Sequence, residues 1–133
     1  MRILHIAGWV FVPYSGKRAD MNVKSKVWLE KEGKAVFGAG KLSLLEAIES
    51  EGSISGAARK LNMSFRHAWS SINSAEENLG IKLIVRKKGG TGGGESTLTK
   101  EAGILMKKYS ILFEEVLDFS KDRFHSIFSG QLR

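Results

Sequence analysis

The regular part of the chain begins with two short groups of apolar residues. Val23, Val27 and Leu29 precede a polar turn at 30–34 that contains a glycine, and the apolar run 35–37 follows it, which predicts a β-hairpin. Apolar residues then recur at helical spacing over residues 41–50, which predicts an amphipathic helix that ends at Gly52. The apolar positions of that helix are Leu42, Leu45 and Ile48.

The next stretch, residues 53–73, has the pattern of two helices that cross closely. Ser53 is suited to cap the first helix, and small alanines on its inward side allow a second helix to approach. Asn62 stands where the chain must reverse and tolerates a left-handed backbone, while Ser64 can cap the second helix. The inward stripe of the second helix is then Ala68, Ile72, Ala75 and Leu79. This succession predicts a helix-turn-helix.

The outward face of the second helix carries groups that can read bases. Arg66 can form paired hydrogen bonds with guanine, Asn73 can do the same with adenine, and Ser70 suits either a base or a phosphate. Any solvated surface helix is polar on this side, but the succession of short helix, Asn turn and capped helix favours DNA recognition. The candidate contacts are Phe65, Arg66, His67, Ser70 and Asn73. Trp69 lies one step off the inward stripe, and we interpret it as a buried aromatic packed against a neighbouring helix.

A second candidate DNA-binding element follows at residues 81–99. Apolar, β-branched residues over 81–86 and the run Ser-Thr-Leu-Thr over 96–99 predict two strands, joined by a Gly-rich tip with a basic root. In a winged helix such a tip lies along the phosphate backbone of DNA or enters the minor groove. The basic residues Arg86, Lys87 and Lys88 would there supply affinity that is independent of sequence. A disordered linker has a similar composition.

The same glycines outline a nucleotide-binding loop, G-x-x-x-x-G-x-S, from Gly89 to Ser96. That motif requires a lysine where Glu95 stands, and a carboxylate there repels the phosphates that a lysine attracts. The loop also leads into a strand instead of a helix. We therefore expect no nucleotide chemistry at this loop.

The last regular segment is a long helix, expected from a cap at Thr99 to about Phe119. Its apolar residues follow heptad spacing, and Ile104 and Ile111 broaden the stripe. The core of one protomer can absorb this stripe, but we prefer packing of two such helices across a two-fold axis, which places two reading helices about one DNA turn (~34 Å) apart. The candidate dimerisation residues are Leu105, Tyr109, Leu112, Val116 and Phe119. Residues 120–133 extend this helix or fray.

These elements form one domain, residues 21–119, with an arm before it and a C-terminal tail, residues 120–133, after it. Residues 1–20 contain a short apolar run without the basic region and cleavage site of a secretory signal. We expect them to be an N-terminal arm with an extra strand, or a mis-assigned start with Met21 as the true one.

Composition and charge narrow the class of protein. The 133 residues are 42% hydrophobic and 26% charged, which is a globular composition. Twenty-one basic and fourteen acidic residues give a net charge of +7, and the excess lies in residues 1–40 and 83–100. A basic loop suits a polyanionic partner. No apolar run reaches ~18 residues, so we expect no membrane span and a cytoplasmic protein.

The sequence offers little for catalysis or metal binding. It contains no cysteine, which excludes disulfides, thiolate–zinc sites and thiol nucleophiles. The histidines His5, His67 and His125 are far apart. Adjacent acids such as Glu76 and Glu77 point in different directions on their helix, which argues against a catalytic carboxylate pair. We expect no enzyme activity, no metal and no cofactor.

Several of these motifs resemble a known family. Residues 52–64, 79–83 and 98–103 resemble the LysR-type winged helix. More narrowly, the aromatic-basic-x-Ala-Trp run within residues 64–73 and the Gly-rich wing at 89–99 are similar to the N-terminal DNA-binding domain of ModE-type, molybdate-responsive regulators. The resemblance covers residues 23–119.

This resemblance implies a homodimeric transcription regulator that binds double-stranded DNA. Carried over to this chain, the implied contacts in the helix are Ser64 together with Phe65, Arg66, His67, Ser70 and Asn73. The implied contacts in the wing are residues 86–91, which include Thr91. Members of the family continue into a molybdate-binding region, and 14 residues follow Phe119 here, so we expect no oxyanion-binding domain in this chain. A link to molybdenum rests on kinship alone.

We therefore expect an α+β winged helix-turn-helix with an N-terminal β-hairpin, a Gly-rich wing and a long C-terminal dimerisation helix. Its expected function is sequence-specific transcriptional regulation on double-stranded DNA, as a homodimer and without enzymatic activity. One rival interpretation is a winged-helix module for protein contacts, which tight binding of a duplex in moderate salt would exclude. The other is a nucleotide-binding enzyme, against which the absent loop lysine argues.

Overall fold

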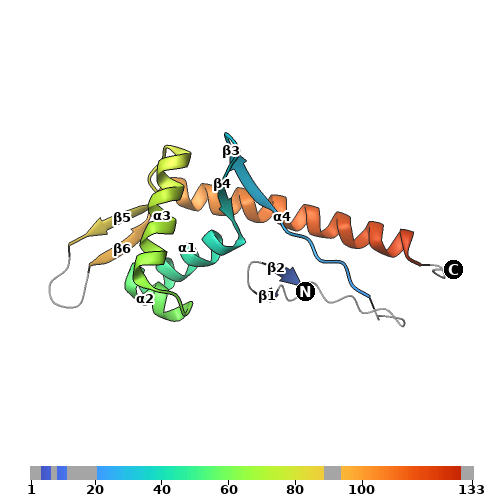
Figure 1. The fold of residues 1–133 in the computed structure, drawn as a ribbon, viewed down its shortest axis with the longest axis horizontal. Coiled ribbons are helices and arrows are strands. Elements are labelled where there is room, and N and C mark those ends of the chain that lie inside the picture. Colours follow the sequence, from blue (N-terminus) through green and yellow to red (C-terminus); the bar gives the residue numbers. More distant parts are fainter. Residues whose placement is uncertain (1–3, 7–8, 12–20, 89–93, 130–133) are drawn as a thin grey trace.

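The computed structural model describes residues 4–6, 9–11, 21–88 and 94–129. The strands are β1 (Leu4–Ile6), β2 (Trp9–Phe11), β3 (Trp28–Lys31), β4 (Lys34–Gly38), β5 (Ile84–Lys87) and β6 (Glu95–Leu98), and the helices are α1 (Ala39–Glu51), α2 (Ile54–Lys60), α3 (Phe65–Leu79) and α4 (Lys100–Ile127). The described strands pair consecutively as antiparallel hairpins. Hairpin β5–β6 extends from one end of the molecule and α4 extends toward the other (Figure 1).

The predicted fold class, an α+β winged helix-turn-helix, is confirmed. The hairpin expected at residues 23–37 is β3–β4, but β3 begins only at Trp28 and the turn is confined to Glu32 and Gly33. The wing strands are β5 and β6, in register from Ile84 opposite Leu98 to Lys87 opposite Glu95. Helices α2 and α3 follow each other across a short turn, as the sequence predicts.

The core lies where α1, α2 and α3 meet the inner face of α4. Helix α1 begins at Ala39, slightly before its predicted start, and ends at Gly52 in the left-handed conformation. Ala57 and Ala58 of α2 are buried, which allows the close approach of neighbouring helices that their size predicts. The largest aliphatic side chains of the interior are Leu44, Leu45, Ile48, Ile72 and Leu83.

The helix boundaries follow the capping residues expected from the sequence. Ser53, Ser64 and Thr99 each accept a hydrogen bond from the backbone N–H three residues later, at 2.9, 3.0 and 3.0 Å respectively. Such a bond satisfies a backbone donor that has no partner within the helix. Asn62, in the turn between α2 and α3, has a φ of 55°, the left-handed conformation that its side chain tolerates.

The root of the wing is attached on two sides. The backbone N–H of Ser96 in β6 donates to the carbonyl of Gly52, at the end of α1, at 2.8 Å. Thr99 donates its backbone N–H to Leu83 at 3.0 Å and its hydroxyl to the carbonyl of Lys82 at 2.7 Å. These bonds place β5 and β6 between α1 and the start of α4.

Helix α4 continues past Phe119 to Ile127, so the first part of the expected tail extends the helix. Its inner face is buried against the rest of the chain at Ala102, Tyr109, Phe113 and Leu117. The segment that precedes β3 runs along α4, because Ser25 Oγ donates to Ser120 Oγ at 2.9 Å.

From its heptad position Tyr109 is expected on the dimerisation stripe, but it is 2% exposed and packs inside its own chain. Its hydroxyl donates to the carbonyl of Val27 at 2.8 Å, and its ring meets Phe37 edge-on with 5.2 Å between centroids. Heptad spacing did not distinguish the two apolar faces of α4, and Tyr109 shares the inner one with Phe113. Tyr109 is therefore not available to a partner chain.

Burial raises the pKa of the Tyr109 hydroxyl above its ordinary value. The folded chain therefore holds this proton more tightly than the unfolded chain does. The corresponding stability is fully present below about pH 10, the ordinary pKa of tyrosine, and is lost as the pH rises through the raised value.

Replacement of Tyr109 by phenylalanine is expected to lower the free energy of unfolding by about 1–2 kcal/mol at neutral pH, because the carbonyl of Val27 loses its donor. Tyr109→Phe is also expected to remove the component of alkaline destabilisation that ionisation of this hydroxyl causes. Urea unfolding of both proteins at pH 7 and in steps to pH 11 measures the two effects. An identical alkaline decline in both proteins would contradict the role given to the hydroxyl.

Candidate nucleic-acid interface

Helices α2 and α3 form the helix-turn-helix unit, and α3 presents the candidate reading surface. The turn closes where the backbone N–H of Met63 donates to the carbonyl of Ala58 at 2.9 Å. The predicted inward stripe of α3 is confirmed: Ala68, Ile72 and Ala75 are buried and Leu79 is half-buried. The opposite side of the first two turns is thereby directed outward.

The predicted contacts at the start of α3 lie together on the surface. Ser64, Arg66, His67 and Ser70 are exposed, and Phe65 is 52% exposed. An exposed, capped helix start of this kind leaves its side chains free to meet a partner.

Trp69 does not occupy the buried position that we expected. It is 45% exposed, so its interpretation as an aromatic braced in the interior is wrong. Successive residues on a helix are about 100° apart. Trp69 follows the buried Ala68 directly, and this rotation places its side chain outside the core. Sequence reasoning missed it as a surface residue, although its position one step off the stripe was the available signal.

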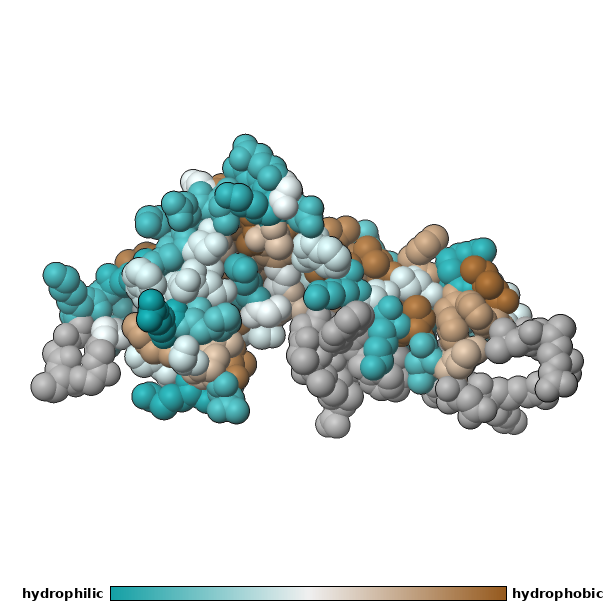
Figure 2. Space-filling view, in the orientation of Figure 1, coloured by the Kyte–Doolittle hydropathy of each residue, from teal (hydrophilic) through white to brown (hydrophobic). Residues whose placement is uncertain are grey.

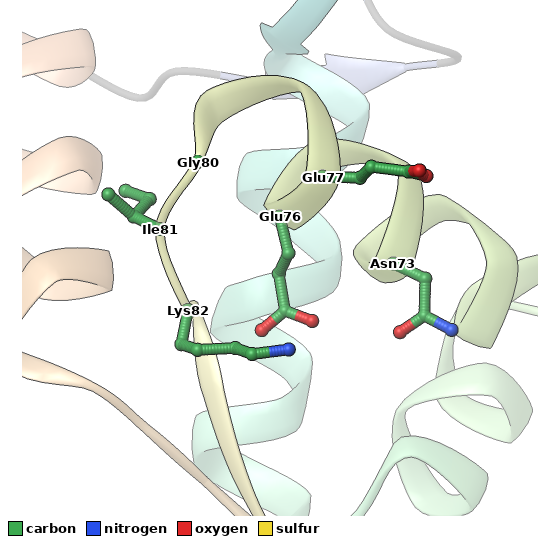
Figure 3. A pocket seen from close by; sticks show the side chains of 6 residues that line it. All are labelled: Asn73, Glu76, Glu77, Gly80, Ile81 and Lys82. Atoms are coloured by element: carbon green, nitrogen blue, oxygen red, sulfur yellow. The ribbon is translucent and has the colours of Figure 1, made fainter.

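A buried carboxylate joins α3 to the wing. Glu76 is 6% exposed and accepts hydrogen bonds from the backbone N–H groups of Leu83, at 2.8 Å, and Ile84, at 3.4 Å. Figure 3 shows its side chain directed from α3 toward the segment that leads into β5, whereas Glu77 points elsewhere. The sequence signal for this bond was an acid next to Ala75 on the inward side of the helix.

Arg86 of β5 completes this connection. Its guanidinium pairs with Glu76 Oε1 at 3.4 Å and donates to Asn73 Oδ1 at 2.6 Å. The structure therefore directs Arg86 toward α3, although its sequence position suggested a phosphate contact. Asn73, expected to read adenine, is half-buried, and its carbonyl oxygen is held by Arg86.

The remaining wing residues are placed differently from Arg86. Lys87 and Lys88 are exposed at the end of β5. Thr91, the fourth wing residue expected to contact DNA, lies outside the described residues, as does the rest of the tip from 89 to 93. The two lysines thus lie exposed in the sequence directly before residues 89–93.

A stripe of apolar side chains lies on a side of α4 that its own chain covers only in part, since Leu105 packs against the edge of the core. Figure 2 shows apolar residues at the surface of the part of α4 that extends from the core. Phe119 is 68% exposed and Leu112 is 41% exposed, while Leu105 and Val116 are half-buried. With the exposed Ile104 and Ile111, the outer α4 stripe consists of Ile104, Leu105, Ile111, Leu112, Val116 and Phe119.

Other kinds of site find little support in the described residues. A shallow hollow of about 430 Å³ lies beside the Glu76 carboxylate, and acidic and amide groups line part of it (Figure 3). Over the described ranges, no three acidic, histidine or cysteine side chains come together as metal ligands. None of the helices that the structure describes combines the length and the apolar character needed to cross a bilayer.

Comparison with known proteins matches this part of the chain to a family. Residues 40–103 match the family described as bacterial regulatory helix-turn-helix protein, lysR family. The molybdenum transport protein ModE of Azotobacter vinelandii is 32% identical over 96 residues, 70% of this chain and 36% of that protein. The DNA-binding transcriptional dual regulator ModE of Escherichia coli K12 is 36% identical over 72 residues, 54% of this chain and 28% of that protein.

Among solved structures, a BenM_DBD complex with benA site 1 DNA is 27% identical to this chain, with a TM-score of 0.47, and the match covers 68% of this chain and 94% of that one. The chain spans about a third of the length of the two curated relatives named above, so their matching regions are confined to one part of each. Residues 52–64 and 98–103, on which the resemblance to this family was based, lie within the matched range 40–103. Residues 40–103 are therefore similar to the helix-turn-helix region of the bacterial regulatory lysR family.

Proposed function

We propose that this protein is a sequence-specific regulator of transcription that binds double-stranded DNA. The position of α3 carries the proposal: its first two turns are exposed, its other side is buried in the core, and the wing is tied to it through Glu76. An α-helix fits the major groove, and a helix-turn-helix presents the start of its second helix to the base edges. The Escherichia coli relative is named as a DNA-binding regulator, which supports a regulatory role without enzymatic activity.

In this proposal the start of α3 supplies the base contacts. Arg66 forms paired hydrogen bonds with guanine, and Ser70 and His67 donate to bases or phosphates. Asn73 donates through its amide nitrogen to a purine while its oxygen stays with Arg86. Ser64 lies at the helix start, where backbone donors favour a phosphate.

The wing supplies affinity that does not depend on sequence. Lys87 and Lys88 are exposed at the end of β5, which supports contact with phosphates, and Thr91 follows them in the sequence. Arg86 contributes less to this attraction, because its guanidinium already pairs with Glu76. The wing lysines therefore act by neutralising phosphate charge and releasing counterions.

The outer α4 stripe supports a homodimer. Its members recur at heptad positions on a helix whose neighbouring face is already covered by its own chain. Packing of two such stripes across a two-fold axis removes them from water and pairs two recognition helices for a palindromic site. Tyr109 takes no part in this contact.

A connection with molybdenum is proposed from the relatives. The Azotobacter vinelandii protein is named for molybdenum transport, and its match covers most of this chain. We infer that the genes controlled here belong to molybdenum metabolism, and that the protein acts in the cytoplasm, where bacterial DNA lies.

Selection of bound duplexes from a random pool tests the proposed function. The wild-type chain is expected to enrich one motif and to bind it far more tightly than random duplex in moderate salt. Arg66→Ala is expected to lose about 1–3 kcal/mol of discrimination at one base pair of that motif, because one bidentate contact is removed.

Lys107→Ala is the matched control for this experiment, since it removes an exposed cation from α4, away from the reading face. It should keep the discrimination of the wild type. Equal losses on the motif and on random duplex for Arg66→Ala would contradict base reading by this residue. Failure to bind any duplex would favour a module for protein contacts.

The wing residues are expected to differ in their response to salt. Lys88→Ala should lower the slope of log affinity against log salt by about one unit, because one phosphate contact is lost. Arg86→Ala should leave that slope nearly unchanged. It should lower the free energy of unfolding by about 1–2 kcal/mol, because the buried Glu76 loses its cation. This loss of stability is limited because 34% of the Arg86 side chain is exposed to solvent. Salt titrations and urea unfolding measure the two effects. A smaller slope with full stability in Arg86→Ala would show that Arg86 contacts phosphate.

Self-association is expected to depend on the outer α4 stripe. Leu112→Lys places a charge within the stripe and should shift a dimer toward monomer at micromolar concentration, since an unpaired charge opposes burial. Glu114→Lys introduces the same side chain at an exposed position about 160° around the helix axis from Leu112 and should leave association unchanged. Sedimentation equilibrium separates the two results. A wild-type chain that remains monomeric would contradict the proposed dimer.

A further inference from the structure

Two aromatic side chains on α3, those of Phe65 and Trp69, are exposed to solvent and are not part of the buried core. Phe65 is 52% exposed and Trp69 is 45% exposed. Because they are four residues apart on one helix, they share a flank. Exposed aromatic pairs of this kind mark a surface that a partner covers.

This flank lies between the polar reading face of α3 and the wing. Phe65 lines a small hollow of about 110 Å³ together with Arg86, Lys87 and Ser96, which places it on the wing side of the helix. Around the helix axis, Trp69 is only about 60° from Arg66, a residue of the reading face. A duplex that meets Arg66 and Lys87 therefore also comes close to the two rings.

The surroundings of the aromatic flank suit a polyanion and not an apolar protein surface. Arg66 borders it on one side and Lys87 borders it on the other, and both are exposed cations. One exposed acid, Glu95, stands opposite Lys87 and lines the same hollow, so the cations outnumber the acids there. Within the major groove of DNA, the C5 methyl of thymine is the apolar group that bases present. A ring directed into the groove can bury against that methyl, which cytosine, guanine and adenine lack.

We propose that Phe65 and Trp69 recognise thymine by contact with its C5 methyl group, and that Trp69 is a specificity-determining residue. This inference rests on the proposed DNA-binding function. In addition to the residues that form hydrogen bonds with bases, the two rings would provide an apolar contact that distinguishes thymine from cytosine. Arg66 and Asn73 are suited to purines, so the two kinds of contact are complementary.

Single replacement of thymine by deoxyuridine in the selected duplex tests the inference, because it removes one methyl group and keeps the base pair. The wild-type protein is expected to bind about fourfold more weakly when the replaced thymine is the one that the rings contact, the effect of losing burial of one methyl-sized group. Trp69→Ala is expected to bind the thymine and deoxyuridine duplexes equally. Fluorescence anisotropy at fixed salt gives the affinities.

Two further variants keep the result interpretable. Trp28→Ala removes another half-exposed tryptophan, on β3, and should retain the fourfold sensitivity of the wild type. Phe65→Ala gives a second removal on the same flank and should reduce the sensitivity. Circular dichroism establishes that each variant is folded before binding is compared.

The possible results separate this inference from the function on which it rests. Tight binding of the duplex with no deoxyuridine effect at any position would overturn thymine reading and leave DNA binding intact. Full methyl sensitivity in both folded aromatic variants would likewise overturn it, because other residues would then contact the methyl. Absence of binding to every duplex would instead refute the proposed function.

Discussion

The bond network of Glu76 is the interaction on which the arrangement of this protein depends. Its buried carboxylate accepts two backbone N–H groups at the start of the wing and pairs with Arg86. A buried charge without such partners is costly, of the order of several kcal/mol, so these bonds favour one fixed position of the wing strand against the helix. In the proposed function, the wing and the outer face of α3 would therefore meet a duplex as one preorganised surface, with little ordering left to oppose binding.

Local features of the fold were predictable because each depends on a few neighbouring residues. Ser53, Ser64 and Thr99 cap the helices that they precede, since a hydroxyl at that position reaches a backbone donor three residues later. Asn62 adopts the left-handed turn for an equally local reason. The spacing of Ala68 and Ile72 gave the orientation of α3, and with it the position of most of the candidate contacts.

The features that were not predictable depend on segments far apart in the sequence. Periodicity showed that α4 is apolar but not which face its own chain covers, and the answer for Tyr109 lies in Val27 and Phe37 of the hairpin region. Trp69 is a similar case, because exposure at the edge of a buried stripe is decided by the elements that pack beside it. In the sequence Glu76 is one of two adjacent acids, and its partners Leu83, Ile84 and Arg86 lie seven to ten residues further along the chain.

Counting charges along a sequence overestimates the attraction that a surface offers to DNA. The segment 83–100 has four basic residues and one acid, yet Arg86 is engaged with Glu76, outside that segment, and so contributes chiefly to the fold. The exposed cations at the end of β5 are Lys87 and Lys88, and with Arg66 on α3 they border the aromatic flank. In the proposed function, affinity from phosphates and discrimination between bases would thus be carried by different residues, with the Arg86–Glu76 pair fixing the wing relative to α3.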